Sequence, residues 1–197
     1  VIGAMATQGD VERFEPLQRF CSGVVVRGVK EILCVQFRNM ATMGGSVASK
    51  FGFSDIIPAL LAVHADIVTY KGGRMSMKDY MNYRERDILV EIRIPKREVP
   101  VAVEALRISR GDFPYLTGSI RRDDTNYEVY IGTRPGAPQL AEKASALLSE
   151  KGLDALDEAA RVASEELVYQ KNSHASKEYR IEMAKAMVRR LVKEVAQ

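Results

Sequence analysis

Short apolar runs separated by turn-forming residues fill the first half of the chain, and this pattern predicts a mixture of short strands and helices. Residues 1–7 (VIGAMAT) favour a strand, and Thr7 or Asp10 can cap a short charged helix directly after it. The β-branched run at 23–35 fits a helix or a strand equally well. The other elements predicted here are a helix that begins near 54–58, a strand at 67–70, a turn at 71–77, a short helix at 78–83 and a strand at 87–95.

The pattern changes after Pro95, which is expected to end the last of these strands. Three strand-like runs separated by turn residues predict an antiparallel meander, and helical runs follow the break at 134–138 (RPGAP). A boundary near 95–100 therefore divides the chain into two predicted subdomains. The strands of the meander are expected at 101–110, 113–122 and 126–133, and the helices at 138–150, 153–167 and 176–196.

The last helix has an apolar residue at every fourth position, which predicts one buried stripe. Its basic residues fall on the other faces, and a charged helix face is usually solvated. A nucleic-acid-binding surface on those basic residues is the less favoured alternative. The stripe consists of Tyr179, Met183, Met187, Leu191 and Val195, and the basic residues are Arg180, Lys185, Arg189, Arg190 and Lys193.

The composition argues against several classes of function. With 29 basic and 26 acidic residues, the chain of 197 residues has a net charge of only +3, and it lacks tryptophan, so no nucleic-acid partner is expected. Cys21 and Cys34 lack the C-x-x-C spacing of a metal or iron–sulfur site, and His64 and His174 lie far apart. No apolar run is long enough for a membrane helix. Two thiols without a disulfide pattern fit a cytoplasmic protein.

The segment ATMGGSVA (41–48) contains the first candidate chemistry. Two adjacent glycines allow backbone amides to converge on an anion, Thr42 and Ser46 add hydroxyl groups, and Arg38 adds a nearby charge. A plain turn is the alternative, because the spacing matches neither a P-loop nor the G-x-G-x-x-G dinucleotide pattern. From these residues alone, the segment is either a turn or a phosphate-binding loop.

The glycine segment is part of a longer ordered pattern, which reads Arg38-Asn39, then Ala41-Thr42-Met43-Gly44-Gly45-Ser46, then Ser54-Asp55, Pro58 and Leu60-Leu61-Ala62. This pattern closely resembles the FAD-binding subunit, or middle domain, of the molybdenum hydroxylases, a family that includes xanthine dehydrogenase and carbon monoxide dehydrogenase. The runs at 1–7 and 87–95 resemble strands of the same domain. The last helix, with its Ser-x-x-Tyr-Arg, resembles the end of the family's C-terminal domain, so the resemblance covers essentially the whole chain.

The resemblance implies an α+β fold in two domains. Residues 1–98 are expected to be the second half of a two-part FAD-binding domain, a mixed sheet with helices. Residues 99–197 are expected to form a C-terminal domain in which an antiparallel three-stranded sheet packs on a helical bundle. The family's FAD site also includes an upstream glycine loop that grips the pyrophosphate, and the 197 residues contain no such segment. The chain is therefore expected to be a fragment, or to have its front half supplied separately.

The resemblance also implies which residues surround FAD. The segment from Thr42 to Ser46 is expected to contact the phosphates through backbone amides and the Thr42 hydroxyl, although Ser46 replaces the family's usual Asn. Asp55 matches a residue that contacts FAD, with a ribose hydroxyl as its expected partner, and its alternative role is a helix cap. Leu89 and Arg107 are expected near the flavin ring, with a core strand residue and a surface charge as the respective alternatives. The full implied set is Arg38, Asn39, Ala41, Thr42, Met43, Gly44, Gly45, Ser46, Asp55, Leu89 and Arg107.

The function implied by the resemblance is electron transfer within an oxidoreductase complex. Electrons are expected to pass from [2Fe–2S] clusters on a small subunit through FAD to NAD or another acceptor. A large subunit would carry the molybdenum cofactor and hydroxylate the substrate, so neither a catalytic acid–base residue nor a metal ligand is expected in this chain, which alone would be inactive. The alternative is a scaffold or assembly module of such a complex that holds no cofactor.

Overall fold

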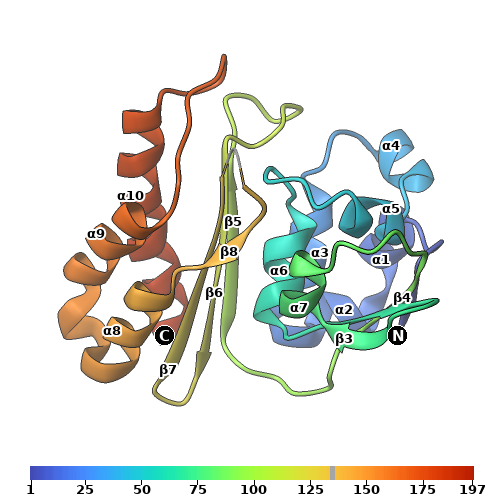
Figure 1. The fold of residues 1–197 in the computed structure, drawn as a ribbon, viewed down its shortest axis with the longest axis horizontal. Coiled ribbons are helices and arrows are strands. Elements are labelled where there is room, and N and C mark those ends of the chain that lie inside the picture. The colour runs from blue at the N-terminus through green and yellow to red at the C-terminus, as the bar shows by residue number, and fades with distance from the viewer. Residues whose placement is uncertain (134–135) are drawn as a thin grey trace.

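The computed structural model describes residues 1–133 and 136–197, which form two antiparallel four-stranded sheets with helices around them (Figure 1). The first sheet has the strand order β1-β4-β2-β3. Ile92 of β4 lies opposite Ile2 on one side and Ile67 on the other, so three apolar side chains form one row across the sheet. The strands are β1 (Ile2–Gly3), β2 (Asp66–Thr69), β3 (Gly73–Ser76) and β4 (Leu89–Arg93).

Short helices surround this first sheet. Thr7 caps the first of them: its side chain accepts a hydrogen bond from the Asp10 amide, and the Asp10 carboxylate accepts one from the Thr7 amide. The ambiguous run at 23–35 proves helical at α3. Helices α2 and α4 were not predicted, because helices of five or six residues leave no periodic apolar pattern in a sequence. The helical bounds are α1 (Gln8–Arg13), α2 (Glu15–Arg19), the 3-10 helix η1 (Phe20–Gly23), α3 (Val24–Lys30), α4 (Val35–Met40), α5 (Met43–Ala48), α6 (Ile56–Ala62) and α7 (Met77–Asn82).

The run at 71–77, predicted as a turn, contains both a turn and the strand β3. The Asp87 carboxylate holds the turn, because it accepts hydrogen bonds from the amides of Lys71 (3.1 Å) and Gly72 (2.9 Å). Burial alone would raise the pKa of Asp87, but these bonds and the one from its neighbour Ile88 outweigh it and hold the pKa well below its usual range. The turn and the strand that follows it are thus fixed by a carboxylate distant in sequence.

The predicted meander of the second half is confirmed. Strands β5, β6 and β7 pair in succession, and the predicted three-stranded sheet gains the short strand β8 at its edge. Gln139 and Leu140 were expected to begin a helix but pair with Ile131 and Tyr130 instead, and the first two residues of the break at 134–138 lie outside the described part. The bounds are β5 (Val101–Leu106), β6 (Leu116–Asp123), β7 (Asn126–Thr133), β8 (Gln139–Leu140), α8 (Glu142–Lys151), the 3-10 helix η2 (Gly152–Ala155), α9 (Leu156–Glu166) and α10 (Lys177–Ala196).

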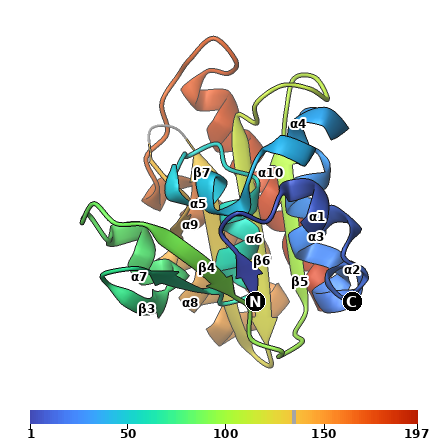
Figure 2. The same cartoon turned by 90° about the vertical axis from the view of Figure 1, so that its right-hand side faces the viewer.

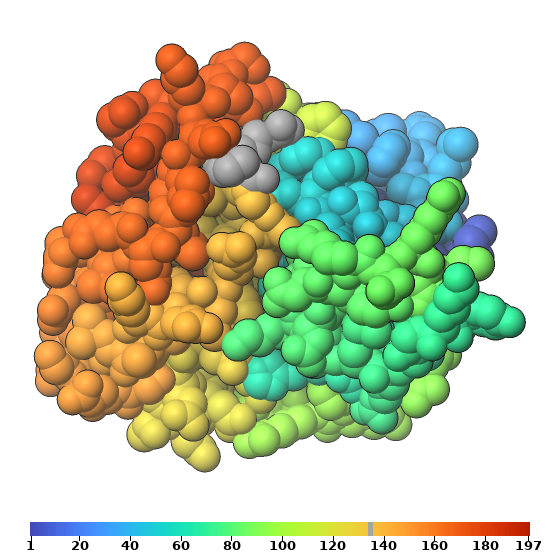
Figure 3. Space-filling view, viewed as in Figure 1, coloured from blue at the N-terminus to red at the C-terminus, as the bar shows by residue number. Residues whose placement is uncertain are grey.

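Both faces of the second sheet are covered. Helices α8, α9 and α10 pack on one face, and α3 and α6 of the first half pack on the other (Figures 1 and 2). As a result Val101, Val103 and Tyr130, which belong to the second sheet, are part of the same hydrophobic core as α3 and α6. In the space-filling view the two halves meet along the middle of the molecule (Figure 3).

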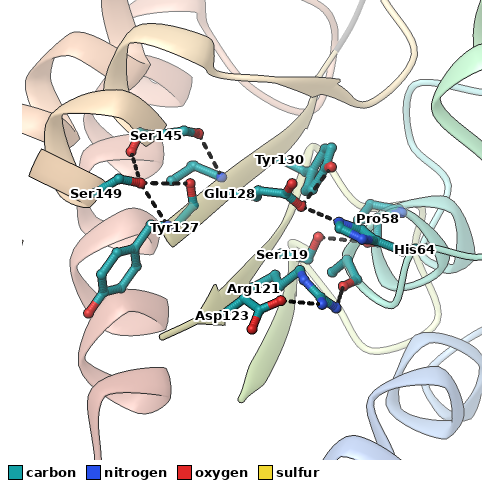
Figure 4. A network of polar contacts seen from close by, with 12 residues as sticks. Pro58, His64, Ser119, Arg121, Asp123, Tyr127, Glu128, Tyr130, Ser145 and Ser149 are labelled. Carbon is teal, nitrogen blue, oxygen red and sulfur yellow. Dashed lines mark hydrogen bonds and ion pairs between the residues drawn. The ribbon is translucent and has the colours of Figure 1, made fainter. Parts of the chain in front are cut away.

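Buried polar contacts join the second sheet to α6 (Figure 4). Ser119, which is fully buried, donates a hydrogen bond to the Pro58 carbonyl at 2.6 Å. The Arg121 guanidinium donates to the Ala62 carbonyl in the last turn of α6 at 3.2 Å, and so supplies one of the donors that a helix end lacks. His64, just after the helix, has its Nε2 2.6 Å from Oε2 of Glu128. These contacts fix α6, which carries one wall of the cleft described below.

The predicted stripe on α10 is buried at Met187, Leu191 and Val195, whereas Tyr179 at its start stays half exposed. Arg180, predicted on a solvated face, is instead completely buried. Its guanidinium donates hydrogen bonds to the Tyr115 carbonyl and to the Asn172 side chain, so tertiary partners outweigh the cost of burying the charge.

Candidate functional site

The segment 41–48 forms the short helix α5, and the prediction of a loop or a turn was wrong. Thr42 is its N-cap, with Oγ1 accepting a hydrogen bond from the Gly45 amide at 3.2 Å. The other amides at this end donate to carbonyls of the chain: Met43 to Ala6 (2.8 Å), Gly44 to Ala4 (2.8 Å) and Ser46 to Thr42 (3.1 Å). Four of the five amides expected to hold phosphate, those of Met43, Gly44, Gly45 and Ser46, are therefore already engaged within the chain.

Glycine occupies the two adjacent positions of α5 for different structural reasons. A Cβ at Gly44 would lie 2.7 Å from the Cβ of Ala4 and 2.8 Å from its carbonyl oxygen, so Gly44 is required for close packing of α5 against the segment after β1. A Cβ at Gly45 would meet only the Thr42 hydroxyl oxygen, at 3.1 Å. Gly45 lines an open cleft, and a side chain there would occupy ligand space.

The cleft has a volume of about 410 Å³ and lies between α4, α5 and the segment that leads into α6. Aromatic rings form much of its wall. The rings of Phe51 and Phe53 stack with centroids 4.8 Å apart, and Phe113 lies at the same distance from Phe53. Phe51 and Phe113 each keep about half of their area exposed. Together with Phe37, these rings present a surface suited to a planar aromatic ligand.

Hydroxyl groups also line the cleft, from Thr42, Ser46, Ser49 and Ser54. The Thr42 hydroxyl uses its oxygen to cap α5, which leaves its proton for a ligand. An apolar wall facing a few convergent polar groups is the usual make-up of a cofactor pocket.

Gln8 is a cleft residue that the sequence did not reveal. It lies in the first turn of α1, is only 2% exposed, and its Nε2 donates to Oγ of Ser46 at 2.9 Å. The sequence offered no signal for it, since nothing along the chain indicates that the first turn of α1 packs against α5. The isolated bridge between Thr7 and Thr42 brings the two segments together.

Asp55 is not the cap of α6, because Ser54 fills that role by accepting a hydrogen bond from the Ile57 amide at 3.2 Å. The Asp55 carboxylate instead forms an ion pair with Arg107, and both side chains are about nine-tenths buried. Burial raises the pKa of Asp55, and the Arg107 guanidinium offsets only part of that rise. Arg107 is therefore no surface charge, and it holds Asp55, which lines the cleft.

Arg38 does not supply the charge expected beside the glycines. Its side chain is 7% exposed and binds both carboxylate oxygens of Glu12, at 2.8 and 3.2 Å, and the Ile32 carbonyl at 2.9 Å. Asn39 accepts a hydrogen bond from Arg13 at 3.0 Å, and Leu89 packs in the core. The structure brings five of the implied residues to the cleft, namely Ala41, Thr42, Gly45, Ser46 and Asp55, and leaves Arg38, Asn39, Met43, Gly44, Leu89 and Arg107 outside its lining.

Comparison with known families shows which domains the chain contains. Residues 1–97 match the family described as the FAD binding domain in molybdopterin dehydrogenase, and residues 102–195 match the CO dehydrogenase flavoprotein C-terminal domain. This chain belongs to the flavoproteins of the molybdenum hydroxylase family. The flavoprotein is also 26% identical over 118 residues to the uncharacterized protein YgfM of Escherichia coli strain K12. That match spans 59% of this chain and 46% of YgfM, so the chain spans about half the length of the curated relatives it matches.

Solved structures share the fold of this flavoprotein over 98% of its length and 73% of theirs. Quinoline 2-oxidoreductase from Pseudomonas putida 86 superimposes with a TM-score of 0.87 at 20% identity. Carbon monoxide dehydrogenases from Hydrogenophaga pseudoflava and Oligotropha carboxidovorans give 0.86 and 0.84, both at 23% identity. The predicted fold class is therefore confirmed, and the chain carries the FAD-binding domain that the resemblance implied.

The residues of the cleft fit a flavin nucleotide. The aromatic wall suits a fused ring system, the free proton of Thr42 suits an anionic or carbonyl oxygen, and the open space beside Gly45 admits a ligand close to the backbone. The part of the chain that the structure describes has no group of three or more His, Cys, Asp or Glu side chains able to hold a metal. No helix within that part has both the length and the apolar character to cross a membrane.

Proposed function

We propose that this chain holds FAD in the cleft beside α5 and serves as the electron-transfer component of a carbon monoxide dehydrogenase-like molybdenum hydroxylase. The observation that carries the proposal is the cleft itself, which is lined by both stacked phenylalanines and hydroxyl groups of the FAD-binding domain. When bound, FAD would supply redox chemistry that side chains lack. A [2Fe–2S] protein is the proposed electron donor, and NAD or another acceptor the proposed destination.

The chain's own residues would bind and orient the cofactor in this proposal. The Phe51–Phe53 stack would contact the ring system, and the Thr42 hydroxyl would donate a hydrogen bond to a cofactor oxygen. Asp55, kept in place by Arg107, would accept hydrogen bonds from a sugar hydroxyl. No residue is assigned an acid–base step. Leu89 and Arg107 remain in the proposal as supports behind the cleft.

The partners in this proposal are an iron–sulfur small subunit and a large subunit that carries the molybdenum cofactor. The solved relatives that support it include carbon monoxide dehydrogenases, and this chain covers 73% of each matched chain. The complex would be cytoplasmic, in keeping with two free cysteines, Cys21 and Cys34.

The test is a fluorescence titration of FAD, FMN and riboflavin into the chain, alone and after reconstitution with its partner subunits. Saturable binding that prefers FAD and weakens in Gly45→Val is the expected result. Gly3→Val is the matched control, because a Cβ at Gly3 meets no atom within 4 Å and lies outside the cleft. Normal folding without FAD binding under either condition would reject the proposal in favour of a scaffold without cofactor.

A further inference from the structure

Gln8 contains a polar atom that the fold leaves without a partner. Its side chain lines the cleft although it is only 2% exposed, and its Oε1 makes no hydrogen bond to any of the described residues. An unpartnered buried acceptor costs free energy, because it has lost water without gaining a donor. Such an atom in a ligand cleft is satisfied when the ligand brings a donor to it.

The neighbours of Gln8 fix the orientation of its amide. Ser46 donates its only hydroxyl proton to the Thr42 carbonyl at 2.9 Å. Ser46 Oγ can therefore only accept from Gln8, which requires the Nε2 end of the amide to face Ser46 at 2.9 Å. The remaining end, Oε1, is held as an acceptor by a chain of two hydrogen bonds that ends on the backbone of α5.

We infer that Gln8 is a positioning residue for the cofactor, and that its Oε1 accepts a hydrogen bond from a hydroxyl group of the ribityl chain or of the adenosine ribose. This inference rests on the proposed function. An acceptor repels a phosphate oxygen, and the donors that FAD offers are its ribityl and ribose hydroxyl groups, the flavin N3–H and the adenine amino group. The contact is assigned to a hydroxyl group because Gln8 is bonded to Ser46, one of the hydroxyl residues of the cleft, whereas the phenylalanine rings supply the surface for the fused rings. Ser46 contributes indirectly, since it sets the orientation of Gln8.

The experiment compares Gln8→Met with the matched variant Gln18→Met, in the chain alone and reconstituted with its partner subunits. Both substitutions remove an Nε2 that donates one hydrogen bond, at 2.9 Å to Ser46 Oγ in one case and at 2.9 Å to the Glu12 carbonyl in the other. Gln18 is exposed and lies outside the cleft. The ligands are FAD, riboflavin, ADP and lumiflavin, which has the flavin ring but no hydroxyl groups.

The dissociation constant for FAD is expected to rise about tenfold in Gln8→Met, which corresponds to one lost hydrogen bond. It should not change in Gln18→Met. If the affinity for riboflavin falls alongside that for FAD while the affinity for lumiflavin, which keeps the flavin N3–H, does not, the donor belongs to the ribityl chain. If the affinity for ADP falls alongside that for FAD, the donor belongs to the adenosine half. Lumiflavin should bind both variants alike. The melting temperature of ligand-free Gln8→Met should be no lower than that of Gln18→Met, since the substitution also removes the unpartnered acceptor.

Three results would overturn the inference. Unchanged FAD affinity in Gln8→Met, with the wild type binding FAD, rejects the role of Gln8 and leaves the proposed function intact. Weakened FAD affinity together with a clearly lower melting temperature of the ligand-free variant would mean that Gln8 acts only in packing. Absence of FAD binding in the wild type, both alone and reconstituted, rejects the inference and the proposed function together.

Discussion

Arg107 lies directly after strand β5 and pairs with Asp55 at the start of helix α6, with only 9% and 10% of the two side chains exposed. The pair therefore links the second sheet to the cleft wall from inside the protein. A buried charge without a partner is strongly unfavourable, and each member of the pair stabilises the protein mainly because it compensates the charge of the other. Loss of either partner is consequently expected to cost far more than loss of an exposed ion pair.

Arg107→Met should lower the free energy of unfolding at neutral pH by about 3–5 kcal/mol, because it leaves the Asp55 carboxylate buried without its partner. Arg190→Met, which breaks the more exposed pair with Glu104, should cost about 1 kcal/mol or less. Urea unfolding of both variants measures the difference. Equal losses would contradict the role assigned to burial.

The cost of Arg107→Met should also depend on pH. Without the guanidinium, the already raised pKa of Asp55 rises further, so the folded variant holds a proton more tightly than the unfolded chain. When folding raises the pKa of a group, the protein becomes less stable as pH increases from the pKa of that group in the unfolded chain, about 4 for Asp, through its pKa in the folded protein. The loss of unfolding free energy in Arg107→Met relative to the wild type should be small near pH 4 and grow toward pH 8. A deficit independent of pH would place the loss in packing alone.

The neighbouring glycines of α5 should respond differently to alanine. Gly44→Ala forces a Cβ into contact with Ala4 and should destabilise the protein by about 1–3 kcal/mol. Gly45→Ala should change stability by less than about 1 kcal/mol, because helix propensity gains offset the crowding of the Thr42 hydroxyl. FAD affinity should fall in Gly45→Ala, and thermal unfolding with FAD titration separates the two effects. A destabilised Gly45→Ala would show that Gly45 also serves packing.

Thr42→Ala removes both a helix cap and a proposed ligand contact, so its control must lose a cap alone. Ser76 provides it, because Ser76 caps the equally short helix α7 through the Asp79 amide at 3.0 Å. Each substitution should cost about 1 kcal/mol of stability. FAD affinity is expected to fall only in Thr42→Ala. Equal FAD affinities of the Thr42 and Ser76 variants would show that the Thr42 hydroxyl does not contact FAD.

Asp87→Asn should destabilise the hairpin of β2 and β3 in a pH-dependent way. Since the folded pKa of Asp87 is lowered, its carboxylate stabilises the protein above the unfolded pKa of about 4, and that contribution is lost as pH falls toward the folded value. Wild type and Asp87→Asn should thus differ most at pH 7, and the difference should shrink steadily as pH falls below about 4 toward the lowered folded pKa. Asp154→Asn, at an exposed position, should match the wild type throughout.

Local pattern was enough to predict the meander and the helices of the second half, because these elements repeat over many residues, but not the two-residue strand β8. It failed where tertiary contacts decide. Arg180 belongs to a helix whose polar face is solvated elsewhere, and its burial is explained by tertiary partners, among them the Tyr115 carbonyl and the Asn172 side chain. The residues around Gly45 were identified through the family resemblance, whereas Gln8 reaches the cleft through a contact between segments 38 positions apart. The spacing of residues along the chain does not indicate such a contact.

The shared face of the second sheet has a consequence for how the protein unfolds. Val101, Val103 and Tyr130 complete a core whose other members lie before residue 93, so neither half can lose its structure without exposing apolar area of the other. Heating should accordingly produce one cooperative transition rather than two. The cleft would then melt together with the distant helix α9, and a ligand bound beside α5 would raise the melting temperature of the entire chain.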